Sequence, residues 1–221
     1  MKLLKSGIVG LISLIVAVLI AVFVAFFILS NKTKSIEDDY SAVFNSDKYK
    51  KAVMVGGIEN IKQDVLCGYA VIEMFSNWNG DNITEESLYS KYGKVVTSTG
   101  KSFCKEMNKQ FPQYTTTMYK YLKNTELLDR VYDSLYKGIP VPFEWAAIHD
   151  NEWTLHYSLI IGMDIPNDSV TVANPYGYIE NITVKELFER ASFSAYKDMP
   201  IFLKLGFAFG LFEKNTIFIV E

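Results

Sequence analysis

The stretch Gln63-Asp-Val-Leu-Cys67-Gly68-Tyr-Ala-Val-Ile-Glu-Met74 places a cysteine directly before an apolar helical pattern. Large apolar side chains recur after it at the i, i+3, i+4 and i+7 spacing of one helix face: Val71, Met74, Phe75 and Trp78. We therefore expect Cys67 in or just before the first turn of a buried helix. The free N–H groups and the helix dipole there favour negative charge, which predicts a lowered pKa for the Cys67 thiol.

Two neighbours of this cysteine are consistent with a nucleophile. Gly68 leaves the approach to the sulfur open, and Gln63 lies just upstream with a side-chain N–H₂ group that can donate to an oxyanion. The alternative interpretation is a small buried core cysteine, which is a common place for a lone thiol. The residues later in the chain decide between these two interpretations.

The composition indicates a globular protein with an appendage. A chain of 221 residues suffices for one sizeable domain, and an aromatic fraction of 14% indicates a well-packed core. The net charge of −3 gives no reason to expect a nucleic-acid partner. Two cysteines are too few for a disulfide scaffold or a zinc knuckle, and His149 with His156 lacks a third metal ligand. We therefore predict neither a metal nor another cofactor.

An uncharged apolar run covers residues 7–29, in which Ser13 is the one polar side chain. As a helix, this run would be about 34 Å long, enough to cross a hydrocarbon core of about 30 Å. We expect an N-terminal transmembrane anchor (1–30), a polar tether (31–50) and one domain (51–221). Lys2 and Lys5 favour a cytoplasmic N-terminus and an extracellular domain, although Lys32 and Lys34 flank the other end. The alternative is a cleaved signal peptide.

Periodicity and capping signals divide the domain into helices and strands. We expect further helices over 84–92, 98–112, 125–138 and 183–190. We expect strands over 114–121, 153–161 and 170–174, an edge strand or strand entry at 139–143, and closing strands at 201–212 and 217–220. Cys104 shares one helix face with Met107 and Phe111, which favours a core position. The alternative is a disulfide with Cys67, which would remove the nucleophile.

His156 lies on the polar face of the alternating strand 153–161. Asn174 ends the following strand, where a hairpin would bring it beside His156. Its carboxamide oxygen could then accept the imidazole N–H and fix the ring tautomer. A structural histidine and an ordinary turn asparagine before Pro175 are the alternatives.

The order of these motifs resembles the C39-like cysteine peptidases of bacteria, which belong to the papain-like superfamily. The resemblance rests on the following residues: Gln63…Cys67-Gly68, His156-Tyr157, Ile161-Gly162, Ala173-Asn174-Pro175-Tyr176-Gly177 and the helix that begins Thr183-Val-Lys-Glu-Leu-Phe188. It implies a papain-like α+β fold with an antiparallel sheet. It also implies Cys67 as nucleophile, His156 as base, Asn174 as the group that orients the base, and Gln63 as oxyanion donor.

This sequence departs from the family pattern at two positions. The family often has Asp where this chain has Asn174, although papain-like enzymes also use Asn. The gap between Gln63 and Cys67 is shorter than usual, which weakens the assignment of Gln63 to the oxyanion. We also expect no transporter domains in this chain.

The sequence therefore predicts a membrane-anchored thiol hydrolase that cleaves a peptide or amide bond in a peptide or protein substrate. Two other functions stay open: a non-catalytic peptide-binding module on the same fold, and a transpeptidase or related acyl transferase. The sequence does not indicate an oligomeric state.

We predict that the full chain stays in the membrane during extraction with high salt or alkaline carbonate and is released by detergent. The apolar run 7–29 is long enough to span the hydrocarbon core, so removing ionic contacts leaves it in place. A chain that begins near Ser35 should remain in the soluble fraction. Release of the full chain by carbonate alone would contradict an integral span.

Overall fold

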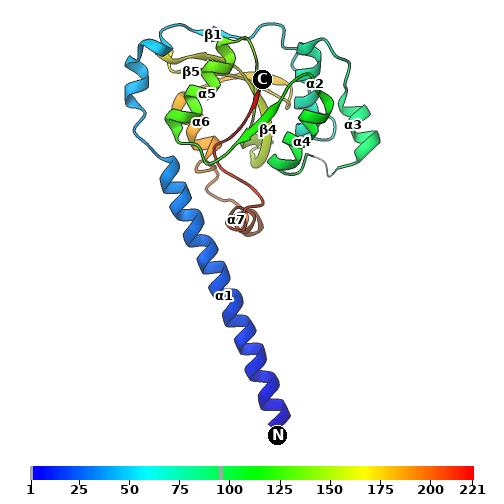
Figure 1. The fold of residues 1–221 in the computed structure, drawn as a ribbon, viewed down its shortest axis with the longest axis vertical. Coiled ribbons are helices and arrows are strands. Elements are labelled where there is room, and N and C mark those ends of the chain that lie inside the picture. Colours follow the sequence, from blue (N-terminus) through cyan, green and yellow to red (C-terminus); the bar gives the residue numbers. More distant parts are fainter. Residues whose placement is uncertain (1, 95–96) are drawn as a thin grey trace.

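The computed structural model describes residues 2–94 and 97–221, with side chains of the N-terminal helix described from residue 8 onward. A long helix, α1 (Lys2–Ile36), stands away from a domain built around one antiparallel sheet (Figure 1). Helices lie on both faces of this sheet. The expected α+β architecture is confirmed.

Most apolar side chains of α1 between Ile8 and Ile28 are exposed, because the domain does not cover this part of the helix. Among the described residues, one helical segment, which begins at Ile8, is long and apolar enough to cross a membrane. An isolated helix of this composition would expose a large apolar surface to water, which is costly.

The segment after the apolar run, where a polar tether was predicted, packs on the domain. Two short 3₁₀ turns follow α1, namely η1 (Ser41–Asn45) and η2 (Asp47–Tyr49). Asp38 accepts hydrogen bonds from the backbone N–H and the hydroxyl of Thr125, at the start of a domain helix. Three apolar side chains of the segment are buried: Ile36, Val43 and Tyr49. These contacts fix the direction in which α1 leaves the domain.

The sheet has the strand order β2-β7-β3-β4-β5-β6. β1 pairs with Gly162 and Met163 of β4, past the last residue of β4 that pairs with β3, Ile160. Every pairing between these strands is antiparallel. The strands are β1 (Val53–Met54), β2 (Thr116–Tyr119), β3 (Val141–His149), β4 (Glu152–Asp164), β5 (Ser169–Asn174), β6 (Tyr178–Ile182) and β7 (Thr216–Val220).

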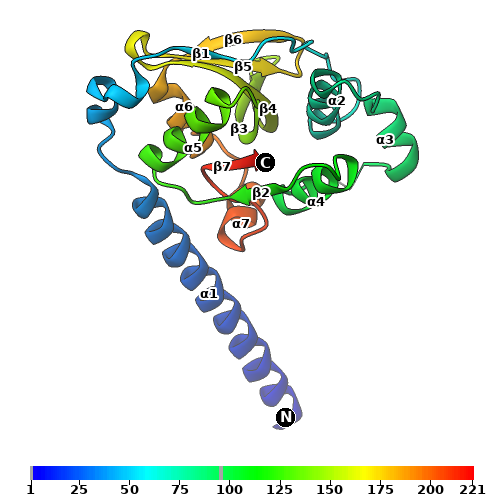
Figure 2. The ribbon, with the colours of Figure 1, turned by 45° about the horizontal axis from the view of Figure 1, so that its top comes forward.

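Two groups of helices cover the two faces of the sheet (Figure 2). The first group is α2 (Cys67–Asn79), α3 (Glu85–Tyr92) and α4 (Gly100–Gln110). The second group is α5 (Asn124–Tyr136) and α6 (Val184–Ala191). Capping boxes at Thr84, Thr99 and Thr183 begin α3, α4 and α6, close to the predicted boundaries.

The predicted alternation of β4 is confirmed. Tyr157 packs in the core cluster that includes α2 and α4. His156 lies opposite Trp145 on β3, and Trp145 belongs to the cluster with α5 and α6. Because successive side chains of a strand point to opposite faces, neighbouring residues of β4 face different helices.

Of the two alternatives predicted for 139–143, the strand entry is confirmed, because β3 begins at Val141, and the edge strand is wrong. β3 lies inside the sheet, between β7 and β4. Pro142 is the second residue of the strand and lies opposite Leu159 of β4, and the pairing of β3 with β7 begins after it, at Phe143, so a missing N–H group is tolerated at this strand start.

The prediction of a strand at 201–212 is also wrong, whereas the strand at 217–220 is confirmed as part of β7. Residues Ile201–Ala208 form a helix, α7. A short continuous apolar run does not distinguish a strand from a helix by periodicity. Here β2 occupies the outer side of β7, so the sheet has no open position for a further strand there.

One buried acid gives the fold a pH dependence. Glu144 on β3 is fully buried, and both of its carboxylate oxygens lack a hydrogen-bond partner among the described residues. Burial, together with the charge of Glu213, raises the pKa of Glu144 from 4.5 to about 8. Between pH 4.5 and about 8, Glu144 is therefore protonated in the folded state and ionised in the unfolded chain.

We predict that stability falls as the pH rises through the window from about 4.5 to 8, and that Glu144→Gln reduces this loss. The native protein disfavours the charged carboxylate, whereas the neutral amide does not ionise. Urea unfolding at pH 5 and pH 8 measures the difference. The exposed Glu152→Gln variant is the control, and an equal pH dependence in both variants would contradict the prediction.

Candidate active site

Cys67 is the first residue of α2, as the sequence predicted. The loop before it is held by Glu85 of α3, whose buried carboxylate accepts the backbone N–H groups of Asp64, Val65 and Leu66. Three hydrogen bonds to one carboxylate fix the chain direction just ahead of the cysteine. The sequence analysis missed this role of Glu85, because no local pattern connects the start of α3 with the loop before α2.

A hollow of about 180 Å³ opens beside Cys67. Its lining comes from α2, from β4 and from the segment before α4: Leu66, Gly68, Lys94, Thr97, Ser98, Leu155 and Tyr157. A Cβ atom on Gly68 would lie 2.6 Å from Cβ of Thr97. Gly68 is therefore needed for close packing of this segment on α2, which differs from its expected role of leaving the sulfur open.

The pKa of the Cys67 thiol differs from the sequence-based expectation. Burial raises it to about 11, while hydrogen bonds from the backbone N–H groups of Tyr157 and Gly68 lower it in part. Desolvation disfavours the thiolate more than the helix N-terminus stabilises it. The expected lowering of the thiol pKa is therefore wrong, and the resting cysteine is a neutral thiol.

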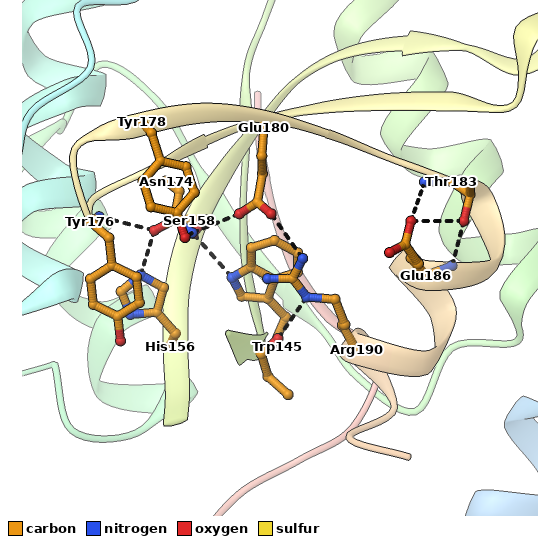
Figure 3. Close-up of polar contacts among 11 residues, drawn as sticks. Trp145, His156, Ser158, Asn174, Tyr176, Tyr178, Glu180, Thr183, Glu186 and Arg190 are labelled. Carbon is orange, nitrogen blue, oxygen red and sulfur yellow. Dashed lines mark hydrogen bonds and ion pairs between the residues drawn. The ribbon is translucent and has the colours of Figure 1, made fainter. Parts of the chain in front are cut away.

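His156 lies buried on β4 under the ring of Tyr176. The two rings are stacked, with centroids 4.0 Å apart and planes at 16° (Figure 3). The hydroxyl of Tyr176 is 2.7 Å from Oγ1 of Thr154, which fixes the ring in place. Burial lowers the pKa of His156 to about 3, although the hydrogen bond with Asn174 opposes this shift. The imidazole is therefore neutral near pH 7.

Asn174 ends β5 and contacts this imidazole, in agreement with the predicted hairpin geometry. Nε2 of His156 is 3.0 Å from Oδ1 of Asn174. The same oxygen accepts the backbone N–H of Tyr176 at 3.0 Å. Because a carboxamide oxygen only accepts, Nε2 carries the proton and Nδ1 keeps its lone pair. This tautomer leaves Nδ1 as the basic atom of His156.

Glu180 and Arg190 hold the Asn174 amide in this orientation (Figure 3). The amide N–H₂ group of Asn174 donates to Oε1 of Glu180 at 2.7 Å. Oε2 of Glu180 pairs with Arg190 at 3.0 Å, and Arg190 also donates to the Ala146 carbonyl at 2.9 Å. The guanidinium lies 3.5 Å above the ring centroid of Trp145. A carboxylate cannot donate, so Asn174 must turn its N–H₂ group to Glu180 and its oxygen to His156.

Gln63 lies against the same corner of the sheet. Its backbone N–H donates to the carbonyl oxygen of Pro175 at 2.7 Å. Its side-chain oxygen is buried and lacks a hydrogen-bond partner in the part of the chain that the structure describes. The hollow beside Cys67 is lined by other residues. Gln63 is therefore tied to the turn after Asn174.

The structure brings His156 and Asn174 into direct contact and places the Cys67 sulfur at the N–H group of Tyr157, the residue after His156. The other cysteine takes no part in this site. Cys104 is half-buried on α4, its thiol donates to the Thr116 carbonyl at 3.3 Å, and both cysteines are free. The alternative of a Cys67–Cys104 disulfide is therefore excluded in this structure.

The domain therefore combines an α+β fold with a thiol at a helix N-terminus and an imidazole on a strand. A carboxamide is hydrogen-bonded to that imidazole. The profile of the Peptidase_C39 like family matches residues 55–200, more than half of the chain. The chain belongs to this family. All four residues singled out in the sequence lie inside the matched range.

The search among curated proteins gave no match. Among solved structures, the chain is similar to a double glycine motif protease from an AMS/PCAT transporter, determined in complex with the leader peptide. The two share 12% sequence identity with a TM-score of 0.48, over 77% of this chain and 97% of that chain.

We predict that Glu180→Ala loosens the His156 tautomer, because Asn174 loses the acceptor that orients its amide. Nitrogen NMR of the two histidines measures which ring nitrogen carries the proton, and the unsubstituted chain should show the Nε2–H form for His156. Glu180→Gln is the matched control, since its carboxamide oxygen can still accept from Asn174. A pure Nε2–H form in Glu180→Ala would contradict a positioning role for Glu180.

Proposed function

We propose that this protein is a membrane-anchored cysteine peptidase that cleaves a peptide or amide bond with Cys67, His156 and Asn174. The observation that carries the proposal is the hydrogen bond between Nε2 of His156 and Oδ1 of Asn174, because it leaves Nδ1 free to accept a proton. Membership of the Peptidase_C39 like family supports a peptide bond as the target. The exposed apolar length of α1 supports the anchor. The proposed orientation, with the N-terminus inside and the domain outside, rests on Lys2 and Lys5 in the sequence.

The proposed reaction starts from a neutral Cys67 thiol and a neutral His156 imidazole. Cys67 lies at the backbone N–H of Tyr157, the residue after His156, and the proposal requires its thiol to come within reach of Nδ1 of His156. Nδ1 then accepts the thiol proton as the Cys67 sulfur attacks the carbonyl carbon and forms a C–S bond. The carbonyl oxygen becomes an oxyanion, for which the backbone N–H of Cys67 and the carboxamide of Gln63 are the proposed donors. The C–N bond then breaks, and the leaving amine takes the proton from His156. Water, deprotonated by His156, hydrolyses the thioester and restores the thiol.

The position of Gln63 supports its proposed role through one contact. Its backbone is tied to Pro175, the residue after Asn174, so the chain before Cys67 runs close to the residue that orients the base. The buried side-chain oxygen of Gln63 has no hydrogen-bond partner among the described residues and can only accept, so the proposed oxyanion contact falls to the side-chain N–H₂ group.

The raised pKa of the Cys67 thiol favours a second candidate function, a peptide-binding module without catalysis. With a thiol pKa of about 11 and an imidazole pKa of about 3, the site holds little thiolate near pH 7. An acyl transferase would use the same three residues, with an amine in place of water. A measurement of products distinguishes these functions.

We predict that the full chain in detergent cleaves members of a mixed peptide library and that Cys67→Ala abolishes cleavage. His156→Ala should lower the rate by about 10²–10⁴-fold, which is the usual contribution of a general base. Cys104→Ala is the control and should retain activity, since Cys104 lies on another helix. Mass spectrometry of the products separates hydrolysis from amine transfer, and binding without cleavage by the unsubstituted chain would favour the binding module.

We predict that Asn174→Asp shifts the acid limb of the pH–rate profile to higher pH. The new carboxylate stabilises the imidazolium and raises the pKa of His156, so a higher pH is needed to obtain the free base. Asn174→Ala should leave a measurable fraction of the activity, because Asn174 orients the ring without transferring a proton. An unchanged acid limb in Asn174→Asp would show that His156 does not act as a free base next to Asn174.

A further inference from the structure

Large apolar side chains on and around α7 are exposed, in the segment that was expected to form a closing strand. They form one group, which we name the α7 patch: Ile201, Phe202, Phe209 and Leu211. Ile201 and Phe202 each have 67% of their surface exposed. Exposed apolar groups of this size usually mark a surface that contacts another phase or molecule.

The α7 patch lies next to the end of α1. Both ribbon views show α7 projecting from the domain on the side where α1 leaves it (Figures 1 and 2). A hollow between the two helices is lined by Phe26 and Leu29 of α1 and by Lys204 and Phe207 of α7. Leu29 also packs against the small core cluster that contains Phe207. These contacts fix the position of α7 relative to α1.

The residues of α1 that α7 contacts determine how deep α7 would lie in a bilayer spanned by α1. The apolar run ends at Leu29, and Lys32 and Lys34 follow it, so a spanning α1 would leave the hydrocarbon core near Leu29. Phe26 lies about 4–5 Å below Leu29 at the rise of an α-helix. A segment that touches both residues therefore lies at the boundary between the acyl chains and the headgroups.

We propose that α7 and the turn after it form a second membrane contact, with the α7 patch inserted at the acyl boundary of the bilayer beside α1. This inference rests on the proposed membrane span of α1. Lys204 lies exposed on α7 and has a long side chain that can reach the headgroups while its stem lies along apolar surface. A lipid surface explains the patch because it continues the exposed apolar surface of α1.

This second contact would also fix the candidate active site at a set height above the membrane. Leu155 on β4 packs with the cluster that contains Leu29, and the same residue lines the hollow beside Cys67. A domain held by one helix can tilt, whereas a domain held at α1 and α7 has a defined orientation. The substrates that reach Cys67 would then be peptide segments close to the membrane surface.

The test places single tryptophans in the full chain and measures quenching by brominated acyl chains in phosphatidylcholine vesicles. Phe202→Trp reports on the α7 patch, Val18→Trp on the middle of α1, and Tyr136→Trp on an exposed position of α5. The signal is the difference from the unsubstituted chain, which contains three tryptophans. We expect Phe202→Trp and Val18→Trp to lose emission with brominated lipid and Tyr136→Trp to keep it.

Each other outcome separates the two proposals. Quenching of Val18→Trp without Phe202→Trp keeps the anchor and overturns the membrane contact of α7. Quenching of Phe202→Trp without Val18→Trp keeps the contact and overturns the span. A blue-shifted but unquenched Phe202→Trp emission would mean that a protein surface, such as a second copy, covers α7, which also overturns the proposal. Phe209→Trp, at the other end of the patch, must give the same result as Phe202→Trp.

Discussion

The hydrogen bond between His156 and Asn174 is the contact on which the arrangement of the site depends. It joins β4 to the end of β5 at the point where the pairing of these strands stops. The bond assigns the imidazole proton to Nε2 and leaves the basic lone pair on Nδ1. Asn174 can make this bond in one orientation because Glu180, paired with Arg190, accepts from its other end. Tyr176 stacks on the imidazole and excludes water from the contact.

Burial has opposite effects on the two titrating groups of the site. It raises the pKa of the Cys67 thiol and lowers the pKa of the His156 imidazole, so that both are neutral at rest. In the proposed mechanism, charge therefore develops only as the thiol proton moves and the carbonyl is attacked. A substrate that fills the hollow beside Cys67 would change the solvation of the thiol, which lines that hollow. The proposed site therefore differs from a preformed thiolate–imidazolium pair.

The same domain connects this site to the proposed membrane surface. The segment after α1 packs on the core through Ile36, Val43 and Tyr49, and α7 packs against the last apolar turn of α1. Two separate contacts therefore fix the angle between the helix and the sheet. Since β4 carries His156 and also packs toward α7 through Leu155, one strand joins the proposed catalytic side chains to the proposed membrane-facing side.

Local patterns in the sequence determined the helix at Cys67, the alternation of β4, the capped starts of α3, α4 and α6, and the pairing of His156 with Asn174. Each of these depends on periodicity or on a short hairpin, so neighbouring residues suffice to predict it. The positioning residues Glu85, Glu180 and Arg190 depend on contacts between distant segments, which no local pattern reveals. The thiol pKa depended on desolvation, and the helical state of 201–208 depended on the absence of an open sheet position beside β7. Only the tertiary structure decided these features, because burial and packing are set by all the elements together.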